Sequence, residues 1–149
     1  MIDTVTPIEI LLVEDNAGDV RLAREALKDS KVANNLYVAT DGVEAMDFLR
    51  KQGQYADVPR PDLILLDLNL PRKHGHEVLE EIKTNEQLKR IPVVILTTSK
   101  AEEDILKTYN LYANCYIVKP VGWDQLITVV KAIQDFWVSI VKLPPDGKH

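Results

Sequence analysis

The sequence has a single cysteine, few aromatic residues and no excess of positive charge. One cysteine among 149 residues excludes an internal disulfide, which favours a reducing compartment. The 18 Lys and Arg are outnumbered by 23 Asp and Glu, and no basic block stands out, so a nucleic-acid surface is not expected. No apolar run approaches the roughly 20 residues that span a bilayer. We therefore expect a cytoplasmic protein with neither a membrane nor a direct nucleic-acid partner.

The length and composition are those of one ordinary globular domain. Apolar residues make up 46% of the chain and charged residues 28%, and the length suits one core better than two. The segment Met1–Pro7 before the first apolar run is short and polar, unlike a signal peptide. We expect a single domain over residues 1–149, with a core at about 8–141, a tail at 142–149 and no output domain.

Short apolar runs alternate with segments of helical periodicity. The runs predict strands over Ile8–Glu14, Leu36–Thr40, Leu63–Asp67, Val93–Leu96 and Asn114–Val118. Between the first two, Val20, Ala23 and Leu27 form an apolar stripe after a candidate N-cap at Asn16. Similar stripes follow the second and third runs, and Ser99 begins a predicted short helix after the fourth. This alternation predicts an α/β fold, with a parallel sheet covered by helices on both faces.

A long last helix is predicted from Gly122 to beyond Ile140. Its core stripe consists of Trp123, Leu126, Val130, Ile133, Trp137 and Ile140. Val129 and Phe136 lie off that stripe. Either a wide stripe packs on the sheet, or part of the helix forms a second apolar face for a partner subunit.

Polar side chains end four of the predicted strands. They are Glu14 with Asp15, Asp67, Thr97 and Lys119. The carboxyl ends of parallel strands open onto one crevice, where α/β folds place their ligands. Three carboxylates brought together there repel one another unless a cation lies between them, and Mg²⁺ prefers such oxygen ligands. We expect a Mg²⁺ site, although any one acid alone more often caps a helix.

A phosphoryl group is the second expected occupant of this crevice. Asp67, at the end of a rigid strand, can form an acyl phosphate. The hydroxyl of Thr97 and the ammonium of Lys119 can bind the phosphoryl oxygens. The alternative is that Thr97 is an ordinary strand residue and that Lys119 reaches water.

Five short stretches carry a family likeness through their order and spacing. They are Leu11–Asn16, Leu65–Pro71, Gly75, Leu96–Thr98 and Tyr116–Pro120. The chain resembles the receiver domains of two-component response regulators over nearly its whole length. The resemblance implies a flavodoxin-like, doubly wound five-stranded sheet in the order 2-1-3-4-5, with five helices.

The resemblance also implies a reaction. A histidine kinase would transfer a phosphoryl group to Asp67, and Glu14 and Asp15 would bind Mg²⁺ with the backbone carbonyl of Asn69. The protein would be a phosphoacceptor in signalling and not an enzyme, with at most slow self-dephosphorylation.

The same resemblance implies a switch, and the sequence departs from the family's usual pattern at two positions. Thr97 and Tyr116 would form the switch pair, and Lys119 would hold the phosphate. Glu14 and His74 stand where the family usually has aspartate. We expect His74 to be a solvated loop residue.

A narrower likeness is to the small response regulators that partner cyanobacterial and other bacterial phytochromes. It rests on Asp67–Lys73, Asn114–Tyr116, Phe136–Trp137 and Leu143–Pro144. It implies a phytochrome-type kinase, an unidentified downstream protein and a homodimer. The dimer would use the face of helix 4, strand 5 and helix 5, with Val129, Phe136 and Trp137.

Two other functions remain open at this stage. Asp67-Leu68-Asn69 superficially resembles the nucleophile motif of haloacid dehalogenase-type phosphatases, but the amide of Asn69 cannot act as their general acid. The second is a receiver that is not phosphorylated and serves protein contacts alone.

Overall fold

The structure is a computed structural model that describes residues 7–30, 33–68, 70, 73–97, 115–118, 127–128 and 130–132. The elements are β1 (Ile8–Val13), α1 (Ala17–Asp29), β2 (Asn34–Ala39), α2 (Gly42–Leu49), η1 (Gly53–Tyr55), β3 (Leu63–Asp67), α3 (Gly75–Thr84), β4 (Val93–Thr97) and β5 (Cys115–Val118). No helix among the described residues has the length and apolarity needed to cross a membrane.

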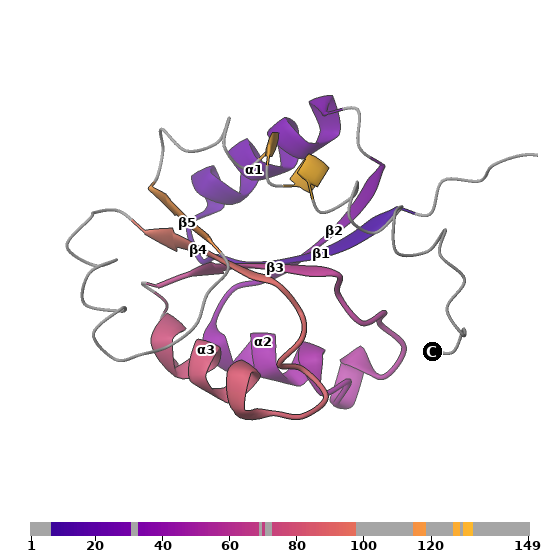
Figure 1. Ribbon diagram of the computed structural model, residues 1–149, viewed down its shortest axis with the longest axis vertical. Helices are drawn as coiled ribbons and strands as arrows, with labels where there is room; N and C mark the ends of the chain where they lie inside the picture. Colours follow the sequence, from indigo (N-terminus) through magenta and orange to yellow (C-terminus); the bar gives the residue numbers. More distant parts are fainter. Residues whose placement is uncertain are drawn as a thin grey trace, which may run out of the picture.

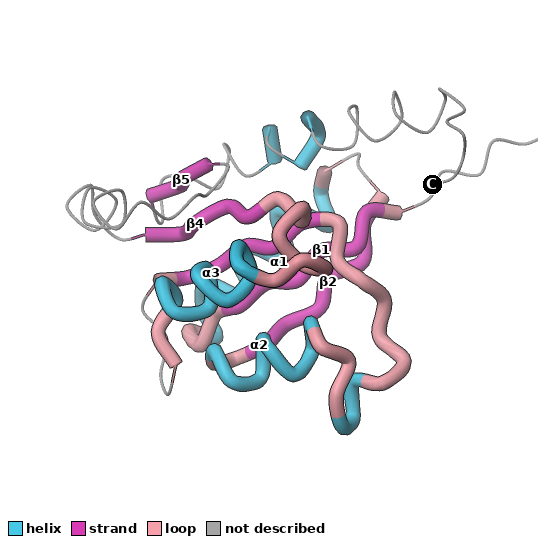
Figure 2. Tube along the Cα trace, turned by 60° about the horizontal axis from the view of Figure 1, so that its bottom comes forward, coloured by secondary structure: helices cyan, strands magenta, loops and turns pink. Residues whose placement is uncertain are grey.

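The strands form one parallel sheet in the order β2-β1-β3-β4-β5. Helix α1 lies on one face of this sheet, and α2 and α3 lie on the other (Figures 1 and 2). The predicted α/β fold with a doubly wound parallel sheet is confirmed. The arrangement places the carboxyl ends of all the strands at one edge, where the predicted polar residues follow them.

The apolar runs form strands because each strand buries both of its faces. In β1, Leu11 and Val13 belong to the cluster beneath α2 and α3, whereas Ile10 and Leu12 belong to the cluster beneath α1. This alternation follows from the two-residue period of a strand. A fully buried aliphatic side chain contributes roughly 1.5–3 kcal/mol, so the two clusters hold the three layers together.

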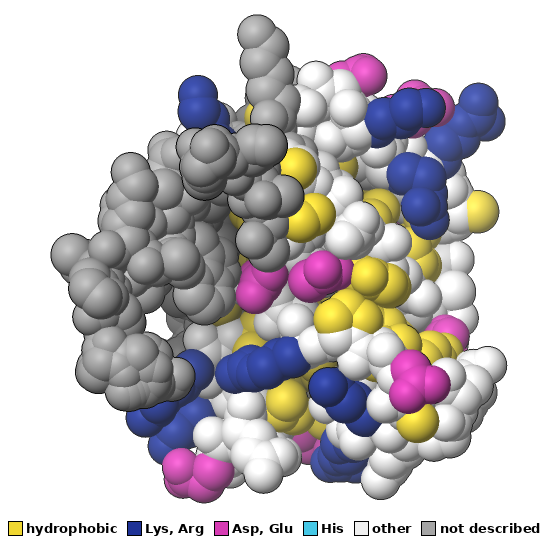
Figure 3. Space-filling view, turned by 90° about the vertical axis from the view of Figure 1, so that its right-hand side faces the viewer, with side chains coloured by type: hydrophobic (Ala, Val, Ile, Leu, Met, Phe, Trp, Pro, Cys, Tyr) yellow, Lys and Arg dark blue, Asp and Glu magenta, His cyan; other side chains and the backbone are white. Residues whose placement is uncertain are grey.

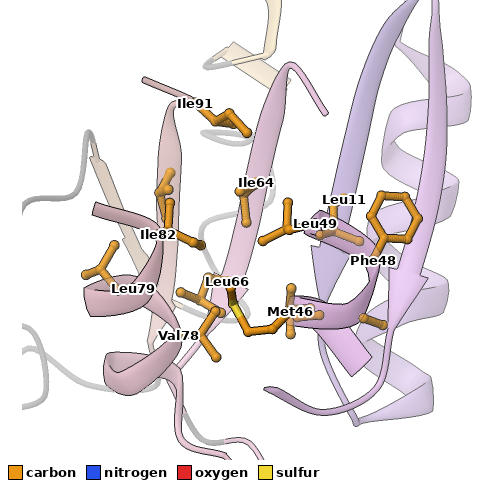
Figure 4. Close-up of a cluster of buried hydrophobic side chains, with 14 of the residues drawn as sticks. Leu11, Met46, Phe48, Leu49, Ile64, Leu66, Val78, Leu79, Ile82 and Ile91 are labelled. Carbon is orange, nitrogen blue, oxygen red and sulfur yellow. The ribbon is translucent and has the colours of Figure 1, made fainter. Parts of the chain in front are cut away.

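The larger cluster lies between the sheet and the α2–α3 layer. Figure 4 shows Met46 and Leu49 of α2 meeting Leu66 and Ile64 of β3, with Ile82 of α3 beside them. All five are buried, as the periodic stripes in the sequence predict.

Both of the first two helices begin at a side-chain cap. The Asn16 side chain accepts a hydrogen bond from the Asp19 amide at 2.9 Å, which confirms the predicted cap of α1. Asp41 accepts from the Glu44 amide at 2.7 Å in the same way. Asp41 is buried at this N-cap position.

Several strand boundaries differ from the prediction by one or two residues. Strand β2 begins at Asn34 and not at Leu36, because pairing with β1 extends it over two polar residues. The connection between α2 and β3 contains the short 3-10 helix η1. The short fourth helix, Val129 and most of the last helix lie outside the described residues; within that last segment, Val130 is fully buried in the α1-side cluster, as predicted.

Candidate functional site

Three carboxylates converge where β1 and β3 end. Val13 pairs with Leu66 in the β1–β3 register, so the residues that follow leave the sheet side by side. One carboxylate oxygen from each of Glu14, Asp15 and Asp67 lies within 4.8 Å of the other two. The structure thus brings together the three acids that the sequence predicted at this edge.

The acids differ in exposure. Glu14 is 1% exposed and Asp67 is 2% exposed, whereas Asp15 faces solvent. Two buried carboxylates so close to a third cost free energy unless positive charge compensates them. The site therefore has one open side, through Asp15, and a buried floor that favours a cation.

Local backbone geometry holds Glu14 in place. Its amide donates to the Ala39 carbonyl at 2.9 Å, which continues the sheet one residue beyond β1. Its carboxylate also accepts from the Asn16 amide at 3.1 Å. The longer arm of Glu14, relative to aspartate, thus folds back toward the start of α1.

The backbone at Asp67 is packed against the start of α3. The Gly75 amide donates to the Leu68 carbonyl at 3.2 Å, and the Leu68 amide donates to the Leu96 carbonyl at 3.2 Å. A Cβ on Gly75 would lie 2.6 Å from the Leu68 Cα and closer still to the Asp67 carbonyl oxygen. Glycine is needed here because a helix meets a strand end at backbone distance.

The other predicted residues are placed only in part. Thr97 ends β4, one residue beyond Leu96, which pairs with Asp67. Tyr116 lies in β5, which neighbours β4, and Thr97 pairs with Val118. The two predicted switch residues therefore lie on adjacent strands. Lys119 and Asn69 lie outside the described residues.

His74 is an exposed residue, as expected, but it has a defined position. It is the N-cap of α3, and its amide donates to the Glu77 carboxylate at 3.0 Å in a capping box. Its ring stacks on that of His76, with centroids 5.8 Å apart.

Sequence reasoning missed how α2 supports the loop after β3. A Cβ on Gly42 would collide with the Lys73 carbonyl, so the start of α2 touches this loop directly. The Lys73 ammonium pairs with Glu81, which also accepts from Arg50 at 2.9 Å. The only signal in the sequence was the glycine itself, since such contacts join segments far apart in the chain.

The donor set fits a divalent cation. All three groups are hard oxygen ligands, and the open side at Asp15 leaves room for water, as Mg²⁺ and Mn²⁺ require. The geometry is thus compatible with a metal-assisted reaction at a carboxylate.

Comparison with known proteins gives the family. The response regulator receiver domain profile matches residues 10–131. The chain is 52% identical over 138 residues to response regulator Rcp1 of Synechocystis sp., covering 93% of this chain and 94% of Rcp1.

Two crystal structures are similar throughout. One is the phosphorylated cyanobacterial phytochrome response regulator RcpA, with a TM-score of 0.75, 53% identity, and coverage of 91% of this chain and 96% of RcpA. The other is the Mn²⁺-bound form of Rcp1, with a TM-score of 0.74, 53% identity, and coverage of 88% and 94%. The phosphatase and contact-only alternatives are not favoured by these matches. The chain belongs to the response regulator receiver domain family, the phosphoacceptors of two-component signalling.

Proposed function

We propose that Asp67 is the phosphoacceptor of this receiver. The observation that carries the proposal is its position: it is 2% exposed and its carboxylate lies within 4.8 Å of those of Glu14 and Asp15. A buried strand-end carboxylate beside two further acids has the charge environment that a cation-assisted phosphoryl transfer needs.

The reaction is a transfer between two side chains. A carboxylate oxygen of Asp67 attacks the phosphorus of a phosphohistidine on the kinase, an O–P bond forms, and the P–N bond to the imidazole breaks. A bound divalent cation would supply charge neutralisation for the carboxylate and the entering phosphoryl oxygens. Because Gly75 has no side chain, the start of α3 can pack directly against the backbone of Asp67.

The remaining roles follow the family resemblance. Mg²⁺ would be held by Glu14, Asp15 and Asp67 together with the carbonyl of Asn69; the Mn²⁺-bound relative supports a divalent ion here. Thr97 would bind the phosphoryl oxygens and, with Tyr116 on the neighbouring strand, form the switch.

Lys119 would complete the phosphate site, because it directly follows Val118, the last residue of β5. Its ammonium would pair with a phosphoryl oxygen.

The wider assignments are also proposals. We infer one receiver domain over residues 1–149 with five strands, five helices and a long last helix. The kinase would be of the phytochrome type, as the name of RcpA suggests for that protein. A homodimer would form through the helix 4–strand 5–helix 5 face with Val129, Phe136 and Trp137, and the protein would act in the cytoplasm.

Phosphoryl uptake tests the central assignment. The chain is incubated with radiolabelled acetyl phosphate and Mg²⁺, and incorporated label is followed after gel separation. The wild type is expected to take up label that hydroxylamine releases, as an acyl phosphate should. Asp67→Asn should take up none, because an amide does not form this bond.

Asp41→Asn is the matched control. Asp41 is also a buried strand-end aspartate, but it caps α2 through the Glu44 amide. It should label like the wild type. Labelling of Asp67→Asn at the wild-type level would refute the assignment.

The partners need separate measurements. Phosphotransfer from a phytochrome-type kinase should be faster than from an unrelated histidine kinase. Sedimentation with and without beryllofluoride and Mg²⁺ should show a dimer; a monomer under both conditions would rule out the dimer proposal.

A further inference from the structure

An open groove runs between the second half of α1 and β2. Its volume is about 770 Å³, and it is lined by α1 residues, the α1–β2 connection and the first four residues of β2. This is the end of β2 opposite the carboxylate site, because the strands are parallel. Figure 3 views the molecule from this end and shows apolar side chains exposed among basic and acidic ones.

One wall of the groove is an open sheet edge. Strand β2 is the outermost strand, with β1 as its neighbour in the described sheet. The Ile8 amide of β1 donates to the Ala33 carbonyl at 3.0 Å, so the odd-numbered residues of β2 direct their backbone groups toward β1. The N–H and C=O groups of Leu36 and Val38 consequently face outward, where they can pair with another extended chain.

The edge lacks the usual protection against strand addition. Natural edge strands carry charges, proline or a bulge, which discourage pairing. The sequence of β2 is Asn-Asn-Leu-Tyr-Val-Ala, with neither charge nor proline, and its register with β1 is continuous over all six residues. Leu36, Tyr37 and Val38 are only half-buried.

The opposite wall of the groove is positive. Its lining includes Arg24 and Lys28 and no Asp or Glu, in a chain whose net charge is −5. Both side chains are exposed, and neither forms an ion pair with another residue that the structure describes. Four residues apart on a helix, they lie on the same face, about one turn apart.

We propose that this groove binds an extended acidic segment of a partner protein, which adds to β2 as a further strand. The backbone of the segment would bond to the outward groups of Leu36 and Val38. Its alternate side chains would face α1, since a strand has a two-residue period, and carboxylates there would meet Arg24 and Lys28.

Charge favours this occupant over a second copy of the chain. A second β2 would bring no carboxylate of its own, because that strand is uncharged. A second copy pairing through β2 would also bring its own Arg24 and Lys28 near those of the first copy, and these like charges would repel one another. The inference does not rest on phosphorylation of Asp67, because the groove lies at the other end of the strands.

Binding of a defined peptide tests the inference. The full chain is titrated into a fluorescein-labelled peptide, Thr-Glu-Val-Glu-Val-Glu, and fluorescence anisotropy is followed. Saturable binding that weakens with salt is expected. The double variant Arg24→Glu with Lys28→Glu should bind about tenfold more weakly or worse, because two attractive contacts become repulsive. N-methylation of both valines should have a similar effect, because it removes backbone donors.

Arg90→Glu with Lys131→Glu is the matched control. Both side chains are exposed, neither lines the groove, and the change in net charge is the same. This variant and Asp67→Asn should bind like the wild type. Equal binding of a lysine-for-glutamate peptide, of the N-methylated peptide, or by the Arg24 and Lys28 variant would overturn the proposal. So would self-association through β2, shown by a dimer that Val38→Lys abolishes.

Discussion

Val13 and Leu66 are direct neighbours in the pairing of β1 with β3. Each is the last apolar residue before a buried acid, so Glu14 and Asp67 emerge at the same level of the sheet. Parallel pairing in this register therefore builds the carboxylate cluster from segments distant in the chain. A shift of one residue would turn one of these side chains to the other face.

The affinity for a divalent cation should depend on Glu14 and Asp15, the two acids that follow β1. Glu14→Gln and Asp15→Asn each remove one negative charge from a cluster whose oxygens lie within 4.8 Å. At that separation a unit charge contributes several kcal/mol at an effective dielectric of about 20, so each change should weaken Mg²⁺ or Mn²⁺ binding by about tenfold or more. Isothermal titration calorimetry measures this. Asp57→Asn, an exposed acid outside the cluster, is the control; wild-type affinity in both test variants would contradict the metal site.

Gly75→Ala should destabilise the protein by about 1–3 kcal/mol, because the added Cβ meets the backbone of Asp67 and Leu68. Denaturant unfolding followed by circular dichroism measures the change. Gly18→Ala is the matched helical control, since its Cβ would meet only the Asn16 side-chain oxygen, at 3.2 Å. Equal effects of the two substitutions would show that the close contact at Gly75 is unimportant.

Tyr55 fastens the loop after α2 through its hydroxyl. The hydroxyl donates to Glu44, and this hydrogen bond, with a smaller contribution from burial, raises the pKa of Tyr55 to about 12. Tyr55→Phe should cost about 1 kcal/mol, the usual net value of such a bond. Glu44→Gln should bring the pKa of Tyr55 back toward its ordinary value, as read from tyrosinate absorbance. An unchanged titration would contradict the contact.

The raised pKa of Tyr55 also predicts a pH dependence. Because the folded pKa lies above the unfolded value of 10.0, the contribution to stability is fully present below pH 10 and is lost as the pH rises to about 12. The wild type should lose stability across this window more steeply than Tyr55→Phe. Parallel curves for the two proteins would refute the linkage.

Substitution of Asp62 should stabilise the protein, in contrast to the substitution of Tyr55. Burial is the main cause that raises the pKa of Asp62 above its ordinary value of 3.8, even though its carboxylate accepts a hydrogen bond from the Glu9 amide at 2.9 Å. A raised acid pKa favours folding below the unfolded value and opposes it as the pH rises through the folded value. Asp62→Asn keeps an acceptor oxygen and should therefore stabilise the protein at neutral pH.

The gain from Asp62→Asn should disappear at a pH well below 3.8, where the wild-type acid is protonated in both the folded and the unfolded state. Thermal unfolding of both proteins at neutral pH and at the low pH measures this gain. Asp57→Asn, also in the loop before β3 but exposed, should show little change. A loss of stability in Asp62→Asn at neutral pH would contradict the prediction.

Local patterns predicted the elements that bury their side chains in a regular period. Leu63–Asp67 was predicted because consecutive aliphatics fit a doubly covered strand, and Asn16 because its side chain caps a following helix. The start of β2 was predicted at Leu36 and not at Asn34, because Asn34 has no apolar side chain and joins the strand only by pairing with Ile8. Asp41-Gly42 is locally a turn signal, and such a signal does not show what packs over the aspartate. The burial of Asp41 therefore could not be predicted from the sequence.

The sequence by itself determined the α/β class and the strand ends that carry Glu14, Asp15 and Asp67, because backbone sterics and hydrophobic burial leave a periodic trace along the chain. The family was also determined from the sequence, through the order and spacing of its short motifs. Only the tertiary structure decided which strand ends meet, that Gly42 lies on Lys73, and that β2 leaves an uncharged edge beside Arg24 and Lys28. These depend on contacts between distant segments, which packing of the whole core selects and no short stretch of residues encodes.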